Sequence, residues 1–344
     1  MTIKKKTMGK HENTEIIEYT LVNKNNISVS ILNLGGIITN ITTPDRNGNL
    51  ENIVLSYEDF NDYYSNPSYY GAIIGRTAGR INKGEVSING VLYNLNKNYG
   101  VNSGHGGNIG FDKRIWEVTE INNDNCSKLE LRLFSKHLEE NYPGDLTVKV
   151  IYELNDNNEF FFKIWGKSTE DTLLNITNHS YFNLSGNYKR DILNHSLKIS
   201  SNKFLEIDEN GGVTGNTINT FNTPFDFNKF KKISKDIHEN NRQIKLGNGY
   251  DHPFLLDNNK IVIKDEESGR VMKIETNQEA VVVYSMNYYN DCMLKGSIRP
   301  KERMAICFET QAPPIGYNES FKEGSYLKKG EVYSKYTKYS FFND

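Results

Sequence analysis

The stretch LELRL at residues 129–133 places an apolar side chain at every second position and a charged side chain between them. Successive side chains of a β-strand point to opposite faces, so this period of two predicts a strand with one buried and one exposed face. The same alternation recurs along the chain in short runs rich in β-branched and aromatic residues. These runs are residues 27–31, 147–150, 160–165, 271–274, 280–284 and 304–309.

Turn residues separate these runs in the way expected of antiparallel hairpins. Residues 86–93 (VSINGVLY) set Asn89-Gly90 between two short apolar runs, and Asn-Gly is the strongest short signal for a two-residue hairpin. Polar clusters that separate further pairs of predicted strands are found at residues 122–127, 155–158 and 266–269.

Helical periodicity is weak. Residues 58–64 and 233–240 are the two candidates for short helices. There is no alternation of strands and helices, no internal repeat and no Pro/Ser-rich linker. The sequence therefore predicts an all-β fold: one large antiparallel β-sandwich with few short helices, forming a single domain over residues 1–344.

Composition excludes several classes of partner. The formal net charge is -2, and the longest basic block is Lys4 to Lys6, so no nucleic-acid footprint is expected. The longest uncharged apolar stretch, residues 280–286, is too short to span a bilayer, and no secretory signal follows Met1. Three cysteines are an odd number, which favours reduced thiols in a cytoplasmic protein, with Cys307 as a small core residue.

The seven histidines differ in their surroundings. Four of them, His11, His137, His195 and His238, have settings that give no reason for a functional role. His105 lies in a glycine-rich loop, where the backbone can approach a ligand closely. His179 lies in a polar run beside aromatic residues, and His252 precedes Pro253 in a segment that is best explained as a structural turn.

Glu309 ends the apolar run 304–309, so we expect its carboxylate at a rim where an apolar wall can tune its pKa for general catalysis. When each residue is taken alone, a purely structural explanation is about as good as a functional one. The structural explanations are a turn for His105, a buried ring with satisfied hydrogen bonds for His179, and an ordinary salt bridge for Glu309.

Other chemistries find no support. No His-x-His, His-Glu-x-x-His or paired-cysteine spacing is present, so neither a metal nor a cofactor is expected. No Gly-x-Ser-x-Gly elbow is present either. Residues 75–80 (GRTAGR) contain two glycines but lack the third glycine and the helix of a dinucleotide-binding fingerprint.

Six segments, in this order, resemble the aldose 1-epimerase (galactose mutarotase) family. The resemblance extends from about residue 30 to the C-terminus and so covers almost the whole chain. The segments are residues 71–81 (GAIIGRTAGRI), 105–116 (with HGG, GFDK and Trp116), 178–184 (NHSYFNL), 223–226 (TPFD), 250–253 (YDHP) and 309–311 (ETQ).

The resemblance implies a large antiparallel β-sandwich and a role for six residues. His179 becomes the general acid and Glu309 the general base. The residues implied in substrate binding are Arg80 and His105, which would hold sugar hydroxyls or the ring region, Asp251, which would bind further hydroxyls, and Tyr181, which would flank the acid. Arg76 also matches the family pattern, and we assign it a structural role.

The chain departs from the family pattern at four places that bear on sugar preference. Gly79 stands where many members have Asn, Gly104 replaces the usual Leu, and Val282 stands where some members carry a sugar-binding Gln. Residues 312–315 (APPI) replace a Pro-Asp pair.

Exchange of anomers needs one proton removed from the C1 hydroxyl and one delivered to the ring oxygen, with no redox step. A histidine suits the acid because its ordinary pKa is near neutrality. We expect the cations Arg80 and His105 to keep Glu309 ionised as the base. The expected substrate is a free hexose, galactose or glucose, turned over by a monomer or homodimer; a sugar-binding protein without turnover and an epimerase for phosphorylated hexoses are the alternatives.

Overall fold

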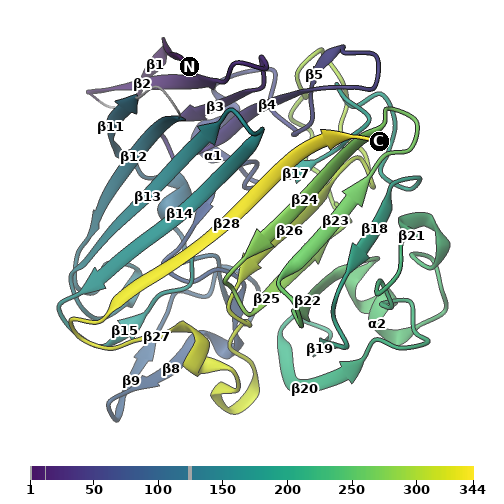
Figure 1. The fold of residues 1–344 in the computed structure, drawn as a ribbon. Coiled ribbons are helices and arrows are strands. Elements are labelled where there is room, and N and C mark those ends of the chain that lie inside the picture. The colour runs from purple at the N-terminus through teal and green to yellow at the C-terminus, as the bar shows by residue number, and fades with distance from the viewer. Residues whose placement is uncertain (1, 12, 123–125) are drawn as a thin grey trace.

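The computed structural model describes residues 2–11, 13–122 and 126–344, and all pairings between its named strands are antiparallel. A nine-stranded sheet forms the front layer in Figure 1. Its strands in spatial order are β11 (Glu117–Asn122), β12 (Cys126–Ser135), β13 (Leu146–Asn155), β14 (Glu159–Ser168), β28 (Val332–Asn343), β24 (Arg270–Thr276), β23 (Lys260–Lys264), β18 (Ser196–Ile199) and β21 (Lys231–Lys232).

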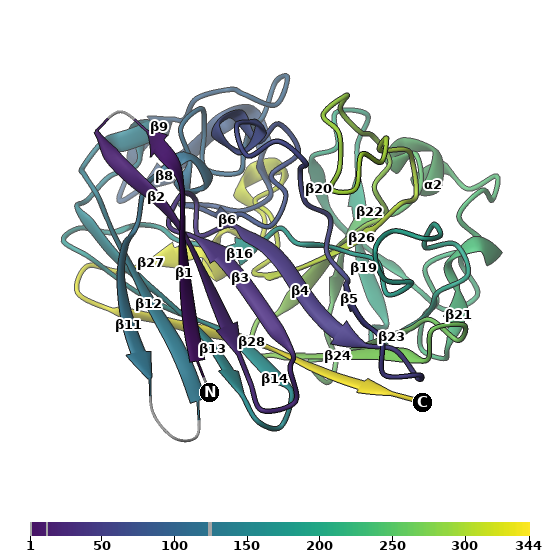
Figure 2. The same cartoon turned by 90° about the horizontal axis from the view of Figure 1, so that it is seen from above.

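Two smaller sheets cover the inner face of this layer. A five-stranded sheet packs against β11 to β13 and a six-stranded sheet lies behind β28, β24 and β23, as Figures 1 and 2 show. The five-stranded sheet consists of β1 (Thr2–His11), β2 (Thr14–Val22), β3 (Ser28–Leu32), β4 (Ile38–Pro44) and β5 (Leu50–Asn52). The six-stranded sheet runs in the order β17 (Tyr181–Phe182), β26 (Ile306–Gln311), β25 (Ala280–Tyr284), β22 (Asp251–Leu255), β19 (Lys203–Ile207) and β20 (Val213–Asn219).

Short strands form four further pairs: β7 (Arg80–Ile81) with β10 (Ser103–Gly104), β6 (Ile73–Ile74) with β16 (Thr177–Asn178), β15 (Thr172–Leu173) with β27 (Tyr326–Leu327), and β8 (Glu85–Ile88) with β9 (Val91–Asn94). The β8–β9 pair confirms the hairpin predicted at residues 86–93. Asn89 and Gly90 both have positive φ there, at 51° and 77°, as the tight turn requires.

The period-two runs lie in strands, except that residue 27 precedes β3 and residues 304–305 precede β26, and most of their apolar side chains pack in the core between the layers. Leu129, Leu131 and Leu133 are buried there, and the charged residues between them are half-buried or exposed. The polar clusters at 155–158 and 266–269 are turns between strands, as predicted. The cluster at 122–127 includes residues 123–125, which lie outside the described residues.

The helices differ from the prediction. A single turn, α1 (Asp62–Ser65), falls at the end of the predicted 58–64 segment. Residues 233–240 hold only a 3₁₀ turn at Ile233–Lys235, and the helix begins later, as α2 (Arg242–Gly247). Asn241 explains the shift, because its side chain accepts hydrogen bonds from the first free backbone N–H groups of α2.

The remaining helical segments are single 3₁₀ turns at Asn82–Gly84, Phe111–Lys113, Glu139–Asn141, Tyr317–Glu319 and Lys322–Ser325. Within the described ranges, no helix is both long and apolar enough to cross a membrane.

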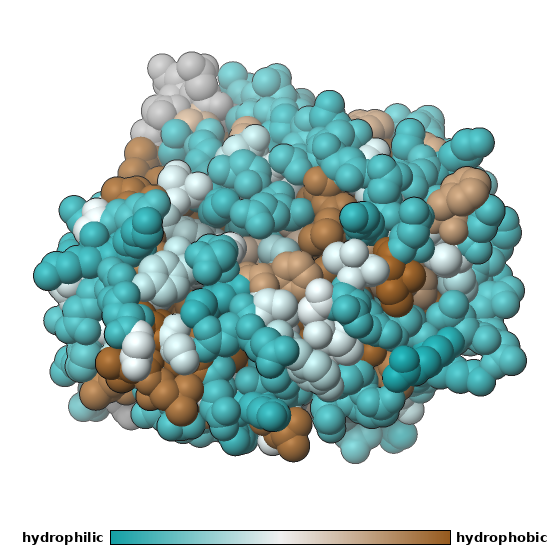
Figure 3. Space-filling view, turned by 90° about the horizontal axis from the view of Figure 1, so that it is seen from below, coloured by the Kyte–Doolittle hydropathy of each residue, from teal (hydrophilic) through white to brown (hydrophobic). Residues whose placement is uncertain are grey.

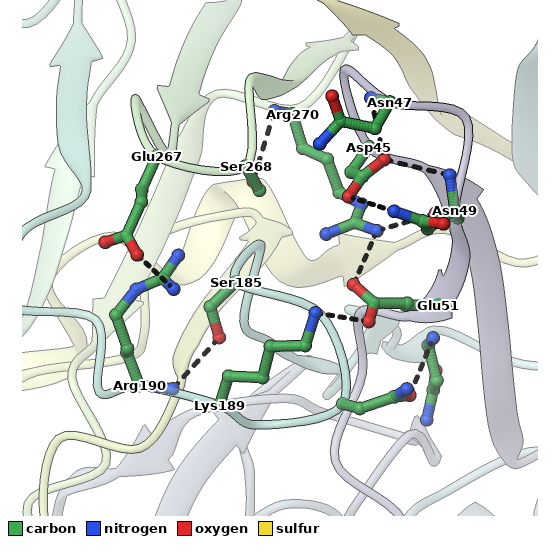
Figure 4. A network of polar contacts seen from close by, with 12 residues as sticks. Asp45, Asn47, Asn49, Glu51, Ser185, Lys189, Arg190, Glu267, Ser268 and Arg270 are labelled. Carbon is green, nitrogen blue, oxygen red and sulfur yellow. Dashed lines mark hydrogen bonds and ion pairs between the residues drawn. The ribbon is translucent and has the colours of Figure 1, made fainter.

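A buried polar network ties β5 and β24 to the loop that follows β17 (Figure 4). The guanidinium of Arg270 is almost fully buried and donates to Glu51, 2.9 Å away, and to the backbone carbonyl of Thr43. Lys189 of the loop forms an ion pair with the same Glu51. A buried charge is tolerated only when it is paired and hydrogen-bonded, so this network anchors the loop that follows β17 to β5 and β24.

Candidate active site

A cavity of about 300 Å³ opens on the side of the six-stranded sheet that faces away from the nine-stranded sheet. Along β26 and β25, Phe308, Val281 and Val283 enter the core, so the side chains between them point into the cavity. The cavity is lined by polar, aromatic and apolar residues, among them Tyr69, Gly79, Arg80, Tyr99, His105, His179, Tyr181, Ile207, Val213, Asp251, Pro253, Val282, Tyr284 and Glu309. All six residues assigned from the sequence therefore line one cavity.

Glu309 occupies the middle of β26, not its end. The prediction of a carboxylate at a strand terminus was wrong, because the strand continues to Gln311 and Glu309 is only 3% exposed. Val282 on β25 pairs with Glu309, and the next pair on the same face of that ladder, Tyr284 with Cys307, extends the same surface. The carboxylate of Glu309 is therefore surrounded by a largely apolar surface of the sheet.

His179 lies between β16 and β17 and reaches the same point from the other side. Its Nε2 is 3.4 Å from Oε1 of Glu309, and both side chains are buried. Tyr181 stacks on the His179 ring with centroids 5.1 Å apart, and Tyr69 stacks at 5.9 Å. The Nδ1 atom is 3.6 Å from Sγ of Cys307, which is fully buried, as predicted for a core cysteine. The ring is held so that Nε2 faces the carboxylate and the cavity.

Burial sets the ionisation of this pair. It raises the pKa of Glu309 to about 8, with the nearby Asp251 adding to the rise, because both effects penalise the carboxylate. It lowers the pKa of His179 to about 4, because the imidazolium is penalised in the same way. At neutral pH the ligand-free pair therefore carries one proton, and burial favours the state in which Glu309 holds it.

The expectation that Arg80 and His105 keep Glu309 ionised was wrong. His105 is itself buried, and desolvation lowers the pKa of its ring well below 6.5, so it brings no positive charge. Arg80 does lower the pKa of Glu309, but its effect is smaller than those of burial and of Asp251.

Arg80 and Asp251 form a second polar group at the cavity wall. Nη2 of Arg80 donates to Oδ2 of Asp251 at 3.2 Å, and Nη1 donates to the carbonyl oxygen of Gly211 at 2.8 Å. The ring of Tyr99 lies under the guanidinium, 4.8 Å from its carbon. Nε of Arg80 is buried without a partner, which leaves a donor for a bound molecule.

His105 follows β10 and is placed by close backbone contacts. It has a φ of 51°, and the next residue, Gly106, packs so tightly that a Cβ there would lie 1.9 Å from the carbonyl oxygen of Gly75. The ring meets His179 edge-on, with centroids 5.5 Å apart, and Nδ1 of His105 has no partner. The glycines after His105 are therefore needed to bring its ring into the cavity.

The departures from the family pattern change the cavity wall. A Cβ at Gly104 would lie 2.7 Å from Cδ2 of Tyr99, so glycine is what lets Tyr99 pack there beneath Arg80. Gly79 lines the cavity with a φ of 74°, and a Cβ there would lie 2.9 Å from Cγ of Pro314. Val282 presents an apolar surface directly beside Glu309.

Sequence reasoning missed the aromatic walls formed by Tyr69, Tyr99 and Tyr284. Only Tyr284 carried a signal, since it ends the run 280–284 on the same face as Val282. Tyr69 and Tyr99 lie in irregular segments, where no periodicity indicates direction.

The residues set aside from the sequence lie away from the cavity. Arg76 is buried and donates to the carbonyl oxygens of Pro143, Ser135 and Lys136, which supports its structural assignment. His252 is fully buried beside Phe225, in β22 rather than in a turn. His195 is buried, and its Nε2 accepts a hydrogen bond from the backbone of Leu184.

Nitrogen and oxygen atoms of His105, His179 and Glu309 all lie within 4.8 Å of one another. These three residues are thus able to offer ligand atoms to one metal ion, although the sequence contains no ligand spacing that indicates a metal.

Comparison with known proteins agrees with this architecture. The family model of aldose 1-epimerase matches residues 18–340. The chain is 34% identical to the aldose 1-epimerase of Streptococcus thermophilus, over 100% of this chain and 99% of that protein. It is 34% identical to the galactose mutarotase of Bos taurus, over 94% of each. The crystal structure of galactose 1-epimerase from Lactobacillus acidophilus superimposes with a TM-score of 0.90 at 27% identity, covering 99% of both chains.

The sandwich and the paired histidine and glutamate in its cavity define an isomerase of the mutarotase class. The chain belongs to the aldose 1-epimerase family.

Proposed function

We propose that this enzyme interconverts the α and β anomers of free hexoses, galactose or glucose, with residues 1–344 acting as one mutarotase-like domain. His179 serves as the general acid at the ring oxygen and Glu309 as the general base at the C1 hydroxyl. The observation that carries the proposal is the separation of 3.4 Å between Nε2 of His179 and Oε1 of Glu309 inside a buried cavity. Two proton-transfer groups facing one space are what opening of a hemiacetal ring requires.

The protonation of the pair fits the two stages of the reaction. With the ring closed, the reactive state is ionised Glu309 with protonated His179. Ring opening moves one proton to Glu309 and one from His179, and leaves both groups neutral beside a neutral aldehyde. Burial favours that neutral state, as the raised pKa of Glu309 and the lowered pKa of His179 indicate. Desolvation thus assists opening, and the same two groups reverse their roles when the ring recloses on the other face.

The other polar groups would hold the sugar. Asp251 and Arg80 face the cavity beside Glu309, and His105 presents its ring beside His179. Tyr181, stacked on His179, keeps the acid in place and lines the wall. Because proton transfer alone completes the reaction, no cofactor is needed.

A phosphorylated hexose is a poorer candidate substrate. A phosphate group is normally held by several cationic side chains, and Arg80 is the one Lys or Arg side chain among the described residues that line the cavity. Arg80 is already paired with Asp251, and Arg76 is buried elsewhere. A free sugar accords better with this set of donors.

The names of related proteins support a sugar substrate: the relative from Bos taurus is a galactose mutarotase. We propose that the protein acts as a monomer or a homodimer, without nucleic-acid or membrane partners. The face shown in Figure 3 is mostly hydrophilic and carries hydrophobic residues in separate small groups, unlike the broad apolar surface of a large obligate interface.

Polarimetry of freshly dissolved α-D-galactose and α-D-glucose tests the proposal directly. Wild-type enzyme should speed the approach to equilibrium, and Glu309→Gln and His179→Asn should each lower kcat by about 10²–10⁴-fold, the usual contribution of a general acid or base. Matched controls are Glu239→Gln and His238→Asn, since both side chains are exposed and remote from the cavity. Near wild-type turnover in either cavity variant would remove that residue from its role.

Calorimetry with the same variants separates an enzyme from a binding protein. Glu309→Gln should keep most of its affinity for galactose, because Arg80, His105 and Asp251 remain. If the wild type binds galactose but does not accelerate mutarotation, the protein is a sugar-binding protein and the proposed enzymatic function is wrong.

A further inference from the structure

The distance between His179 and Glu309 is unusual for a direct contact. At 3.4 Å, Nε2 and Oε1 lie beyond the 2.7–2.9 Å typical of a charge-assisted hydrogen bond. Two ligands bound tetrahedrally at about 2.0–2.2 Å from one ion are themselves roughly 3.4 Å apart. The pair therefore has the spacing of two ligands on a zinc-like ion.

His105 supplies a third donor from a different segment. Its ligand atom lies within 4.8 Å of those of His179 and Glu309. Nδ1 of His105 is buried without a hydrogen-bond partner. The other nitrogen of His179 lies beside Sγ of Cys307, an outer contact of the kind that orients a ligating imidazole. Three protein donors leave a fourth tetrahedral position for water, and all three residues line the cavity.

We propose that these three residues bind one transition-metal ion of the Zn²⁺ type when no sugar is bound, and that the ion competes with the sugar. Two imidazoles and one carboxylate suit Zn²⁺, Co²⁺ and Ni²⁺, whereas Mg²⁺ prefers an all-oxygen site. The ion would bind the same two atoms, Nε2 of His179 and Oε1 of Glu309, that the ring oxygen and the C1 hydroxyl of a sugar must approach from the cavity. Competition rests on the proposed function, but metal binding itself does not.

Calorimetric titration of the chelator-stripped enzyme with ZnCl₂ tests the site. One ion per chain is expected, and saturating galactose should weaken its apparent affinity at least tenfold. His105→Gln, His179→Asn and Glu309→Gln should each lose at least tenfold in affinity. His238→Asn, an exposed histidine, and Cys292→Ser, a half-buried thiol, should bind Zn²⁺ as the wild type does.

Far-UV circular dichroism and thermal unfolding show that each variant is folded. Co²⁺ gives an independent readout, because a four-coordinate site produces intense visible absorption that His105→Gln should remove. Unchanged Zn²⁺ affinity in His105→Gln and His179→Asn would overturn the site.

Polarimetry separates this proposal from the proposed function. Zn²⁺ should raise KM for galactose with kcat unchanged, Mg²⁺ should have no effect, and chelator should restore the rate. Inhibition that lowers kcat at constant KM would overturn competition. Zn²⁺ binding that depends on the three residues in a protein without mutarotase activity would refute the proposed function and leave the metal site standing.

Discussion

Glu309→Gln should produce a protein that is inactive and yet more stable at neutral and alkaline pH. The folded state holds the pKa of Glu309 at about 8, against 4.5 for an ordinary glutamate. The unfolded chain releases this proton above pH 4.5 while the folded chain keeps it, so the contribution to stability is full below pH 4.5 and is lost as pH rises towards 8. At pH 7, 2.5 units above 4.5, the loss amounts to about 3 kcal/mol, and glutamine avoids it.

Thermal unfolding followed by circular dichroism at pH 5, 7 and 8.5 measures the effect. Glu309→Gln should exceed the wild type by only about 1 °C in Tm at pH 5 and by about 5 °C at pH 7, with a larger gain at pH 8.5. Glu239→Gln, with its exposed side chain, should show no such trend. A gain that is equal at all three pH values, or a loss at pH 8.5, would refute the assignment of a desolvated carboxyl to Glu309.

The ionisation of the pair also predicts a pH profile of kcat/KM with a plateau between an acid limb near pH 4 and an alkaline limb near pH 8. Both limbs belong to the pair as a unit, and an alkaline limb near pH 6.5 would contradict the burial of both groups. Asp251→Ala should raise KM for galactose far more than it lowers kcat in polarimetry, because it removes a cavity carboxylate and the ion pair of Arg80; equal changes in both would argue against a holding role. Gly106→Ala should lower Tm and weaken galactose binding, since the added Cβ would lie 1.9 Å from a backbone carbonyl oxygen and the residue has a φ of 92°. A Tm equal to that of the wild type would show that the loop accommodates the Cβ without strain. Dialysis against a chelator should not lower the polarimetric rate, and a rate that returns only with added metal would contradict proton transfer alone.

The sheet framework could be predicted from the sequence because it depends on a local pattern. Period-two runs such as 129–133 and 147–150 lie within strands, since alternation decides which face meets the core. Helices carried no comparable signal: α2 has six residues, and its position depends on the single cap at Asn241.

The members of the site could be named from motifs, but their geometry and ionisation could not. His179 and Glu309 are 130 positions apart in the chain, and their approach depends on the pairing of Tyr181 with Cys307 between β17 and β26. A sequence motif indicates which charged residues lie near a site, but it does not indicate how deeply a side chain is buried. For this reason Arg80 and His105 seemed sufficient to keep Glu309 ionised, although desolvation outweighs them.

The alternation of side chains along β26 constrains how this enzyme can diverge. Phe308 and Thr310 point into the sandwich while Glu309, between them, points into the cavity. Deleting or inserting one residue upstream in this strand would exchange the two faces, burying the carboxylate in the core and turning an aromatic ring into the cavity. Insertions and deletions among related sequences should therefore be found in exposed turns such as Asn89-Gly90, whereas β26 should differ by substitutions only. Directed evolution of sugar preference is best confined to point changes at Val282 and to the loops that carry Tyr69 and Tyr99.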